Sequence, residues 1–153
     1  MRTLVALVAI TGALGMCDVR AQTAADSAAI RQTALDYIEG WYEGNASRME
    51  RALHPDLAKR VVMPGPSGAV VQNMTKDQLV GVTARGAGKM TPPERQRKDV
   101  TILDIFGNAA SVKVVAGDWV DYLHIGKVDD RWVIINVLWE LTEQAKAQMQ
   151  QPR

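Results

Sequence analysis

The sequence predicts an α+β fold, and two observations carry this prediction. Residues 100–139 are rich in β-branched and aromatic side chains and are interrupted only by short turn signals, which indicates four consecutive antiparallel strands. The preceding part of the chain repeats apolar residues at helical spacing, with helices expected over residues 26–43, over residues 46–53 and after Thr75. We expect one domain, because 153 residues suffice for a single core.

The four strands are expected over residues 100–106, 109–116, 119–128 and 132–139. Two-residue hairpin turns are expected at Gly107-Asn108, Gly117-Asp118 and Asp129-Asp130. Turns of this length fix which side chains share a face of the sheet. One face then collects Asp121 together with apolar or small residues, namely Leu103, Ile105, Ala110, Val112, Val114, Ala116, Trp119, Leu123 and Ile125.

Asp121 is the leading candidate for a functional residue. An ionised carboxylate on an apolar face is costly, so it must bond a donor, take up a proton or line a polar pocket. In the alternative interpretation, Asp121 lies at the rim of the sheet and bonds a backbone amide or a Trp or Tyr side chain. The opposite face is mixed and includes Lys113, Tyr122 and His124, which is typical of partial exposure or of an interface.

The last strand can present either of two residues to the Asp121 face. Asn136 lies on that face if Asp129-Asp130 forms a two-residue turn, whereas a bulge there would put Trp139 in its place. Both residues are therefore candidates for the site.

The first helix carries two aromatic side chains that are expected to cover the sheet. Tyr37 and Trp41 are four residues apart, so they lie one above the other on the apolar face of a helix that Asp26 or Ser27 can cap. Core packing is the simpler interpretation of this pair, and contact with a ligand is the alternative.

Local signals also place the elements that follow the first helix. Asn45 and Thr75 are the expected N-caps of the second and third helices. Between these helices, residues 59–63 and 69–73 predict a short hairpin around the loop 64–68.

The first 21 residues have the pattern of a signal peptide. Arg2 precedes an apolar run over residues 4–16, and Val19-Arg20-Ala21 is a small-residue cleavage site. The run is too short to span a membrane as a mature anchor. We therefore expect an exported protein, periplasmic or secreted, with cleavage after Ala21.

The mature chain is then expected to be a single domain over residues 22–153, with its core at 26–139 and a helical or frayed tail at 140–153. Cys17, the only cysteine, leaves an alternative open, because Leu14-Gly15-Met16-Cys17 resembles a bacterial lipoprotein box. Anchoring through Cys17 would replace the preferred cleavage.

Charge and motifs limit the classes of partner. Loss of Arg2, Arg20 and Asp18 from the 18 basic and 17 acidic residues leaves 16 of each, which gives no electrostatic argument for nucleic acid or an anionic membrane. The sequence contains no HExxH pattern, no cysteine-rich metal pattern and no acidic calcium loop. We expect neither a metal nor another cofactor.

Six short segments, in order, resemble the "putative lumazine-binding" family of the NTF2-like superfamily, which has a SnoaL-like cone fold. They are Asp36-Tyr37-Ile38-Glu39-Gly40-Trp41-Tyr42, Ala52-Leu53-His54-Pro55-Asp56-Leu57, Met74-Thr75, Gly107-Asn108-Ala109-Ala110, Asp121-Tyr122-Leu123-His124 and Lys127-Val128-Asp129-Asp130-Arg131-Trp132. The chain departs from the family at Asp130, where Gly is usual, and at Asn45, where Asp is commoner.

The resemblance implies a strongly curved antiparallel sheet wrapped around about three helices, an apolar cone cavity, and frequent dimerisation through the sheet. Members of the superfamily include isomerases, cyclases and dehydratases that use a cavity carboxylate or His, and also proteins without catalysis. The family name does not assign a reaction.

Two functional hypotheses follow. In the first, a small apolar or aromatic molecule binds in a cavity with Asp121 as orienting group or general base; its walls are expected to include Tyr37, Trp41, Trp119, Leu123, and Asn136 or Trp139. In the second, the domain is a non-catalytic association module that pairs with a second copy or another exported protein through Lys113, Tyr122 and His124.

Overall fold

The computed structural model describes residues 15–149, with side chains from residue 24 onward. Its helices are α1 (Gly15–Glu43), α2 (Ala46–Ala52), α3 (Lys76–Ala84) and α4 (Glu143–Met149), with the short 3-10 helices η1 (Ala87–Met90) and η2 (Pro93–Arg95). Its strands are β1 (Leu53–Gly65), β2 (Gly68–Met74), β3 (Asp99–Phe106), β4 (Ala109–Val115), β5 (Trp119–Val128) and β6 (Arg131–Leu141). The predicted α+β class is confirmed. Most of the expected signal peptide, residues 1–14, lies outside the described residues, so export stays a prediction.

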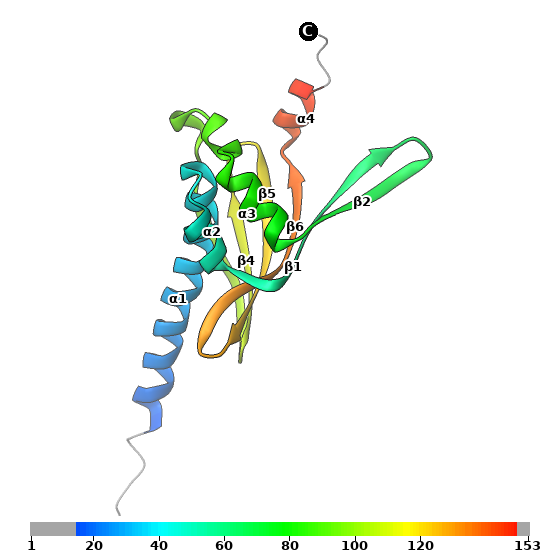
Figure 1. Ribbon diagram of the computed structural model, residues 1–153. Helices are drawn as coiled ribbons and strands as arrows, with labels where there is room; N and C mark the ends of the chain where they lie inside the picture. Colours follow the sequence, from blue (N-terminus) through cyan, green and yellow to red (C-terminus); the bar gives the residue numbers. More distant parts are fainter. Residues whose placement is uncertain (1–14, 150–153) are drawn as a thin grey trace, which may run out of the picture.

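The six strands form one curved sheet in the order β2-β1-β6-β5-β4-β3. Helix α1 lies along one face of the sheet and contacts β3, β4 and β6, with α2 and α3 on the same side (Figure 1). All neighbouring strands are antiparallel except β1 and β6, which are parallel. The expected antiparallel sheet is confirmed apart from this one pair, whose relative direction no hairpin constrains.

The hairpin of β1 and β2 is longer than the sequence predicts. Its pairing extends from Lys59↔Met74 to Gly65↔Gly68, so the turn keeps only residues 66–67 in place of the expected five-residue loop. The end of this hairpin projects away from the rest of the sheet (Figure 1). Its base, by contrast, brings Lys59 next to β6, where Lys59 pairs with Val137.

The predicted caps of the second and third helices are confirmed. The side chain of Asn45 accepts a hydrogen bond from the backbone N–H of Arg48 at 3.1 Å. Thr75 and Gln78 form a reciprocal capping box at the start of α3. The expected cap of α1 at Asp26 or Ser27 is wrong, because α1 already begins at Gly15.

The carboxylate of Asp26 instead joins α1 to the sheet. It accepts hydrogen bonds from Trp132 Nε1 at 2.9 Å and from Lys127 Nζ at 3.2 Å. These two donors lower the pKa of Asp26, the bond from Trp132 contributing most.

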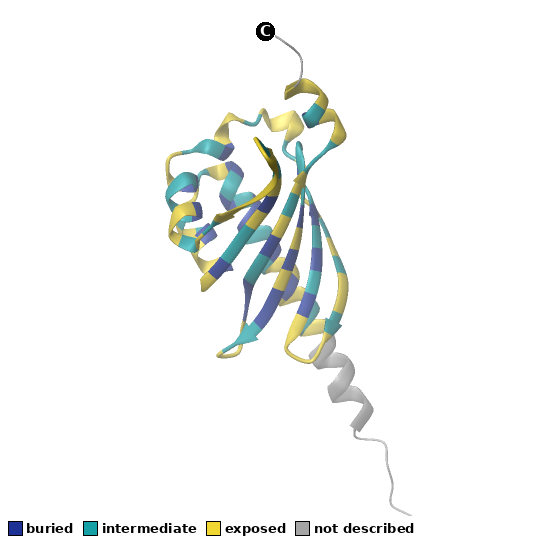
Figure 2. Cartoon of the chain, turned by 90° about the vertical axis from the view of Figure 1, so that its right-hand side faces the viewer, coloured by how far each residue is buried: buried dark blue, intermediate teal, exposed yellow. Residues whose placement is uncertain are grey.

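Helix α1 packs the predicted apolar stripe against the sheet. The fully buried or nearly buried side chains of this stripe are Ile30, Ala34, Tyr37 and Ile38. Along β4 and β5, buried and more exposed residues alternate, as expected for strands with one face on a core (Figure 2). This alternation places Val112, Val114, Leu123 and Asp121 on the helix side.

All three predicted two-residue turns are present in the strand register. Asp129 and Asp130 both adopt the left-handed conformation, with φ of 47° and 61°, as a type I′ turn requires. Asp tolerates this region better than most residues, which explains how Asp130 can replace the Gly that is usual in the family.

A bulge in β6 determines on which face of the sheet the side chains of its second half lie. The register shifts between His124 and Ile125, which leaves Ile135 unpaired. A side chain on Gly126 would place its Cβ 2.5 Å from Ile135 Cδ1, so glycine makes room for this residue. As a result Trp139 pairs with Asp121, although the turn itself has two residues.

A second bulge, at Leu103 in β3, corrects the predicted inner face. The register shifts between Ile102 and Asp104, and Leu103 is 53% exposed. Val100 and Ile102 instead pair with Val114 and Val112 and pack against the core. The expectation that Leu103 faces inward is therefore wrong, because an extra residue reverses the alternation.

Candidate functional site

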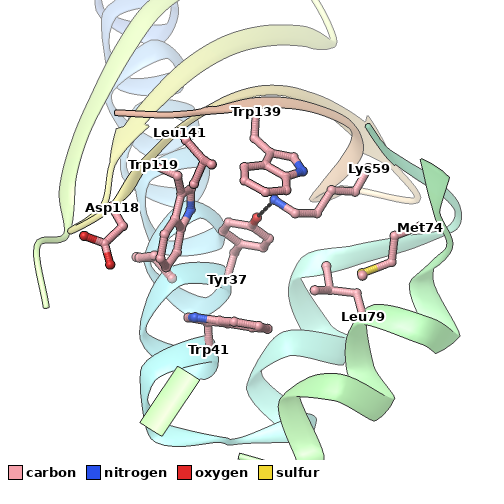
Figure 3. Close-up of a pocket in the computed structure, with 10 residues that line it drawn as sticks. Tyr37, Trp41, Lys59, Met74, Leu79, Asp118, Trp119, Trp139 and Leu141 are labelled. Atoms are coloured by element: carbon pink, nitrogen blue, oxygen red, sulfur yellow. Dashed lines mark hydrogen bonds between the residues drawn. The ribbon is translucent and has the colours of Figure 1, made fainter. Parts of the chain in front are cut away.

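A cavity of about 290 Å³ lies between the helices and the sheet (Figure 3). Most of its wall is apolar or aromatic, and its two charged residues are a lysine and an aspartate. The lining residues are Tyr37, Ile38, Trp41, Lys59, Met74, Leu79, Asp118, Trp119, Trp139 and Leu141.

Local structure explains how aromatic side chains converge on this space. Tyr37 and Trp41 come from successive turns of α1, and Trp119 is the first residue of β5. The rings of Trp41 and Trp119 meet edge to face, with centroids 6.2 Å apart and an interplanar angle of 83°. Trp139 reaches the same space because of the bulge in β6.

The backbone of η1 packs directly on one of these aromatic residues. A Cβ added to Gly88 would lie 2.1 Å from the carbonyl oxygen of Trp41. No larger residue fits this close approach without a backbone shift, so Gly88 helps to fix the end of α1 that carries Trp41.

Asp121 is wholly buried and its carboxylate is bonded by three side chains. Oδ1 accepts from Lys59 Nζ at 2.6 Å and from the Tyr37 hydroxyl at 3.2 Å, and Oδ2 accepts from Trp119 Nε1 at 2.7 Å. These bonds offset the cost of placing a carboxylate on an apolar face. The expected bonding to a Trp or Tyr side chain is present, and the lysine is an addition that the sequence did not predict.

Tyr37 and Lys59 also bond to each other. Lys59 Nζ donates to the Tyr37 hydroxyl at 2.7 Å, so these two residues and Asp121 form a closed triangle of hydrogen bonds. Burial raises the pKa of Tyr37 well above its ordinary value, and the negative charge of Asp121 raises it further. The hydroxyl of Tyr37 is therefore protonated at neutral pH and donates to the carboxylate.

Lys59 is the charged member of this hydrogen-bonded triangle that lines the cavity. Its side chain is 11% exposed, and Nζ lies 5.0 Å from the ring centroid of Trp139 and 5.5 Å from that of Tyr37. These distances suit cation–π attraction. The strand pattern of residues 59–63 places Lys59 and Val61 on one face, but only the parallel pairing of β1 with β6 directs that face to the cavity.

The structure brings together four of the predicted ligand contacts and separates the others. Tyr37, Trp41, Trp119 and Trp139 line the cavity. Leu123 is buried in the core, and neither it nor Asp121 belongs to the cavity lining. The carboxylate of Asp121 lies behind the side chains that bond it, and its role as a general base stays a prediction.

Asn136 lies on the opposite face of the sheet, so its predicted place beside Asp121 is wrong. The bulge at Ile135 pairs it with His124, and both residues line a separate, more open hollow. Lys113 and Tyr122 lie on this outer face too, with Lys113 Nζ 5.9 Å from the ring centroid of Tyr122. The predicted interface candidates therefore do share one surface.

Among residues 24–149, whose side chains the structure describes, no three His, Cys, Asp or Glu side chains lie close enough together to hold a metal ion. None of the described helices is both long and apolar enough to cross a membrane.

Comparison with known proteins identifies the family. Residues 25–140, more than half of the chain, match the family described as "Putative lumazine-binding". The chain belongs to this family. No curated protein matches it.

Solved structures support the same fold. The chain is similar to an NTF2-like protein with a cystatin-like fold from Novosphingobium aromaticivorans, with TM-score 0.65, 12% identity and coverage of 92% of this chain and 99% of that one. It is also similar to NTF2-like proteins of unknown function from Silicibacter pomeroyi (TM-score 0.61, 16% identity, coverage 78% and 98%) and Methylobacillus flagellatus (0.60, 20%, 77% and 93%). At these identities the likeness shows the fold alone.

We expect Asp121→Asn to lower the free energy of unfolding by about 3 kcal/mol, because it leaves the ammonium of Lys59 without its carboxylate in a mostly buried site. In urea unfolding, the double variant Lys59→Met with Asp121→Asn should lose less free energy of unfolding than the sum of the losses in the two single variants. Asp99→Asn, in an exposed pair with Arg97, is the matched control and should change stability by less than about 0.5 kcal/mol. Strictly additive effects of Lys59→Met and Asp121→Asn would contradict the coupling.

Proposed function

We propose that this domain binds a small, largely apolar aromatic molecule in the cavity. The observation that carries this proposal is a space of about 290 Å³ walled mainly by apolar and aromatic side chains, in which a buried carboxylate holds one lining lysine in place. A cavity of about 150 Å³ is enough for benzene, so this one suits one or two fused rings. Apolar pockets with a few fixed polar groups are typical ligand sites.

The family name supports a ligand of this shape. Lumazine, which the description of the family mentions, is a planar molecule of two fused rings. Trp41, Trp119 and Trp139 provide flat surfaces that a planar ring can stack on or meet edge to face.

Binding without proton transfer by Asp121 fits the geometry better than acid–base catalysis. A general base must come within hydrogen-bond reach of the substrate, and Asp121 is fully buried behind Tyr37, Lys59 and Trp119. Tyr37 cannot take its place as a base, because its hydroxyl is protonated at neutral pH.

The cavity can be tested by filling it. We expect Leu141→Trp to weaken binding of lumazine or 2-naphthol at least about tenfold, because Leu141 lines the cavity and the larger ring occupies the space of the ligand. Leu138→Trp is the matched control, since Leu138 is 54% exposed on the opposite face, and should leave affinity within about twofold. Isothermal titration calorimetry measures both, with circular dichroism to verify folding. Equal affinity in the two variants would contradict the proposal.

We further propose that the protein is exported and cleaved after Ala21. In support, the described side-chain contacts between α1 and the sheet begin at Asp26, so cleavage leaves the bonds to Trp132 and Lys127 intact. We expect the intact mass of the protein from its host envelope to correspond to residues 22–153. A full-length mass, or a lipid adduct on Cys17, would contradict this processing.

A second candidate function is self-association through the outer face of the sheet. Tyr122 and Leu138 pair across β5 and β6 on this face and are 46% and 54% exposed, and Val62 and Val71 extend the apolar surface onto the hairpin. Exposed apolar surface of this kind is typical of interfaces.

We expect sedimentation of a homodimer at micromolar concentration. Leu138→Lys should convert it to a monomer, because it places a charge within the apolar face. Met90→Lys, at an 85% exposed position in η1, is the control and should leave the dimer intact. A monomeric parent protein would exclude this candidate.

A further inference from the structure

The proposed ligand cavity has a polar anchor, and this inference rests on that proposed function. We propose that Lys59 donates a hydrogen bond to the bound molecule, and that the cavity selects a neutral ring compound presenting a carbonyl oxygen to Lys59 Nζ. Asp121 is a positioning residue in this arrangement, because it acts through Lys59.

The donor count of Lys59 provides the first argument. An ammonium group has three N–H donors. Two of them are used, by Asp121 Oδ1 at 2.6 Å and by the Tyr37 hydroxyl at 2.7 Å. Among the described residues, no third oxygen or nitrogen accepts from Nζ, which is otherwise flanked by the rings of Tyr37 and Trp139. A ligand oxygen can therefore complete the bonding of Lys59.

The position of Nζ provides the second argument. Lys59 lines the cavity, and Figure 3 shows its ammonium beside Trp139 and bonded to Tyr37. Two short bonds to buried partners hold it there before any ligand arrives. A donor fixed in this way loses little conformational freedom on binding, which favours affinity and orientation.

The balance of charge indicates that the ligand is neutral. The positive charge of Lys59 is already matched by Asp121. Asp118, the other charged residue of the lining, forms an ion pair with Arg95. An anionic ligand would thus bring an uncompensated charge next to a buried carboxylate, which is costly, whereas a carbonyl oxygen needs only a donor.

The apolar lining defines the rest of the molecule. Met74, Leu79 and Leu141 surround the cavity together with the aromatic residues, and they offer no hydrogen-bonding group beyond a weakly accepting thioether. The matching ligand is a compact ring system with one carbonyl at its edge, held by stacking and by one charge-assisted hydrogen bond.

A matched pair of probes tests the anchor. 1-Indanone and indane have nearly the same shape and differ in one carbonyl. Because a hydrogen bond to a charged group contributes about a factor of ten or more in affinity, the ratio of their dissociation constants should change at least about tenfold when Lys59 is replaced. Tryptophan fluorescence follows binding, since Trp41, Trp119 and Trp139 line the cavity.

The variant must not leave Asp121 unpaired, so the anchor is removed in Lys59→Met combined with Asp121→Asn. Lys113→Met, on the outer face, is the matched control and should keep the preference of the parent protein. The infrared C=O band of bound 1-indanone gives an independent readout. It should lie at lower frequency in the parent protein and in Lys113→Met than in the double variant.

The outcomes distinguish failure of the proposed hydrogen bond from Lys59 from failure of the proposed ligand cavity. Suppose that 1-indanone and indane both bind, but that the ratio of their dissociation constants and the C=O band are the same in the double variant as in the parent protein. The role of Lys59 as hydrogen-bond donor is then refuted, and the ligand cavity stands. If neither probe binds the parent protein, both proposals fall. Tighter binding of indane-1-carboxylate than of 1-indanone would refute the selection of a neutral ligand.

Discussion

The carboxylate of Asp121 is the constraint on which the site depends. It lies on the inner face of β5 with no exposed surface, where an unbonded charge would be strongly unfavourable. Its three donors come from α1, from β1 and from the start of β5. Satisfying one buried group therefore requires the first helix, the hairpin strand and the central sheet to meet at a defined point.

This arrangement produces a cavity with mainly apolar walls and a fixed hydrogen-bond donor, the ammonium of Lys59. The carboxylate itself does not face the space, and the ammonium of Lys59 does. The pair thus places a positive donor in an aromatic environment without adding net charge. Among the described residues, Asp118 provides the carboxylate of the lining, and it is already paired with Arg95, which supports our proposal of recognition without proton abstraction.

A second polar cluster keeps α2 in place beside α1. Arg48 bonds Asp36 at 3.0 Å and Glu43 at 2.7 Å, and it also bonds Glu39. Burial would raise the pKa of Glu39, but the bonds from Arg48 and Lys98 outweigh it and lower that pKa. Because α2 leads directly into β1, this cluster also helps to set where Lys59 enters the sheet.

The sequence by itself determined the features that depend on near neighbours. The helix caps at Asn45 and Thr75, the two-residue turns and the odd position of Asp121 on an apolar face all follow from a few adjacent residues. The aromatic pair Tyr37 and Trp41 was also identifiable, because helical spacing puts both on one side.

Only the tertiary structure decided the partner of Asp121 and the residues opposite it. Lys59 is 62 residues away in the chain, and its approach depends on the parallel pairing of β1 with β6, which no turn signals. The bulge at Ile135 places Trp139, and not Asn136, on the face of Asp121, because one extra residue moves every later side chain of a strand to the opposite face. Bulges and strand neighbours are set by packing across the whole sheet, and local sequence therefore does not specify them.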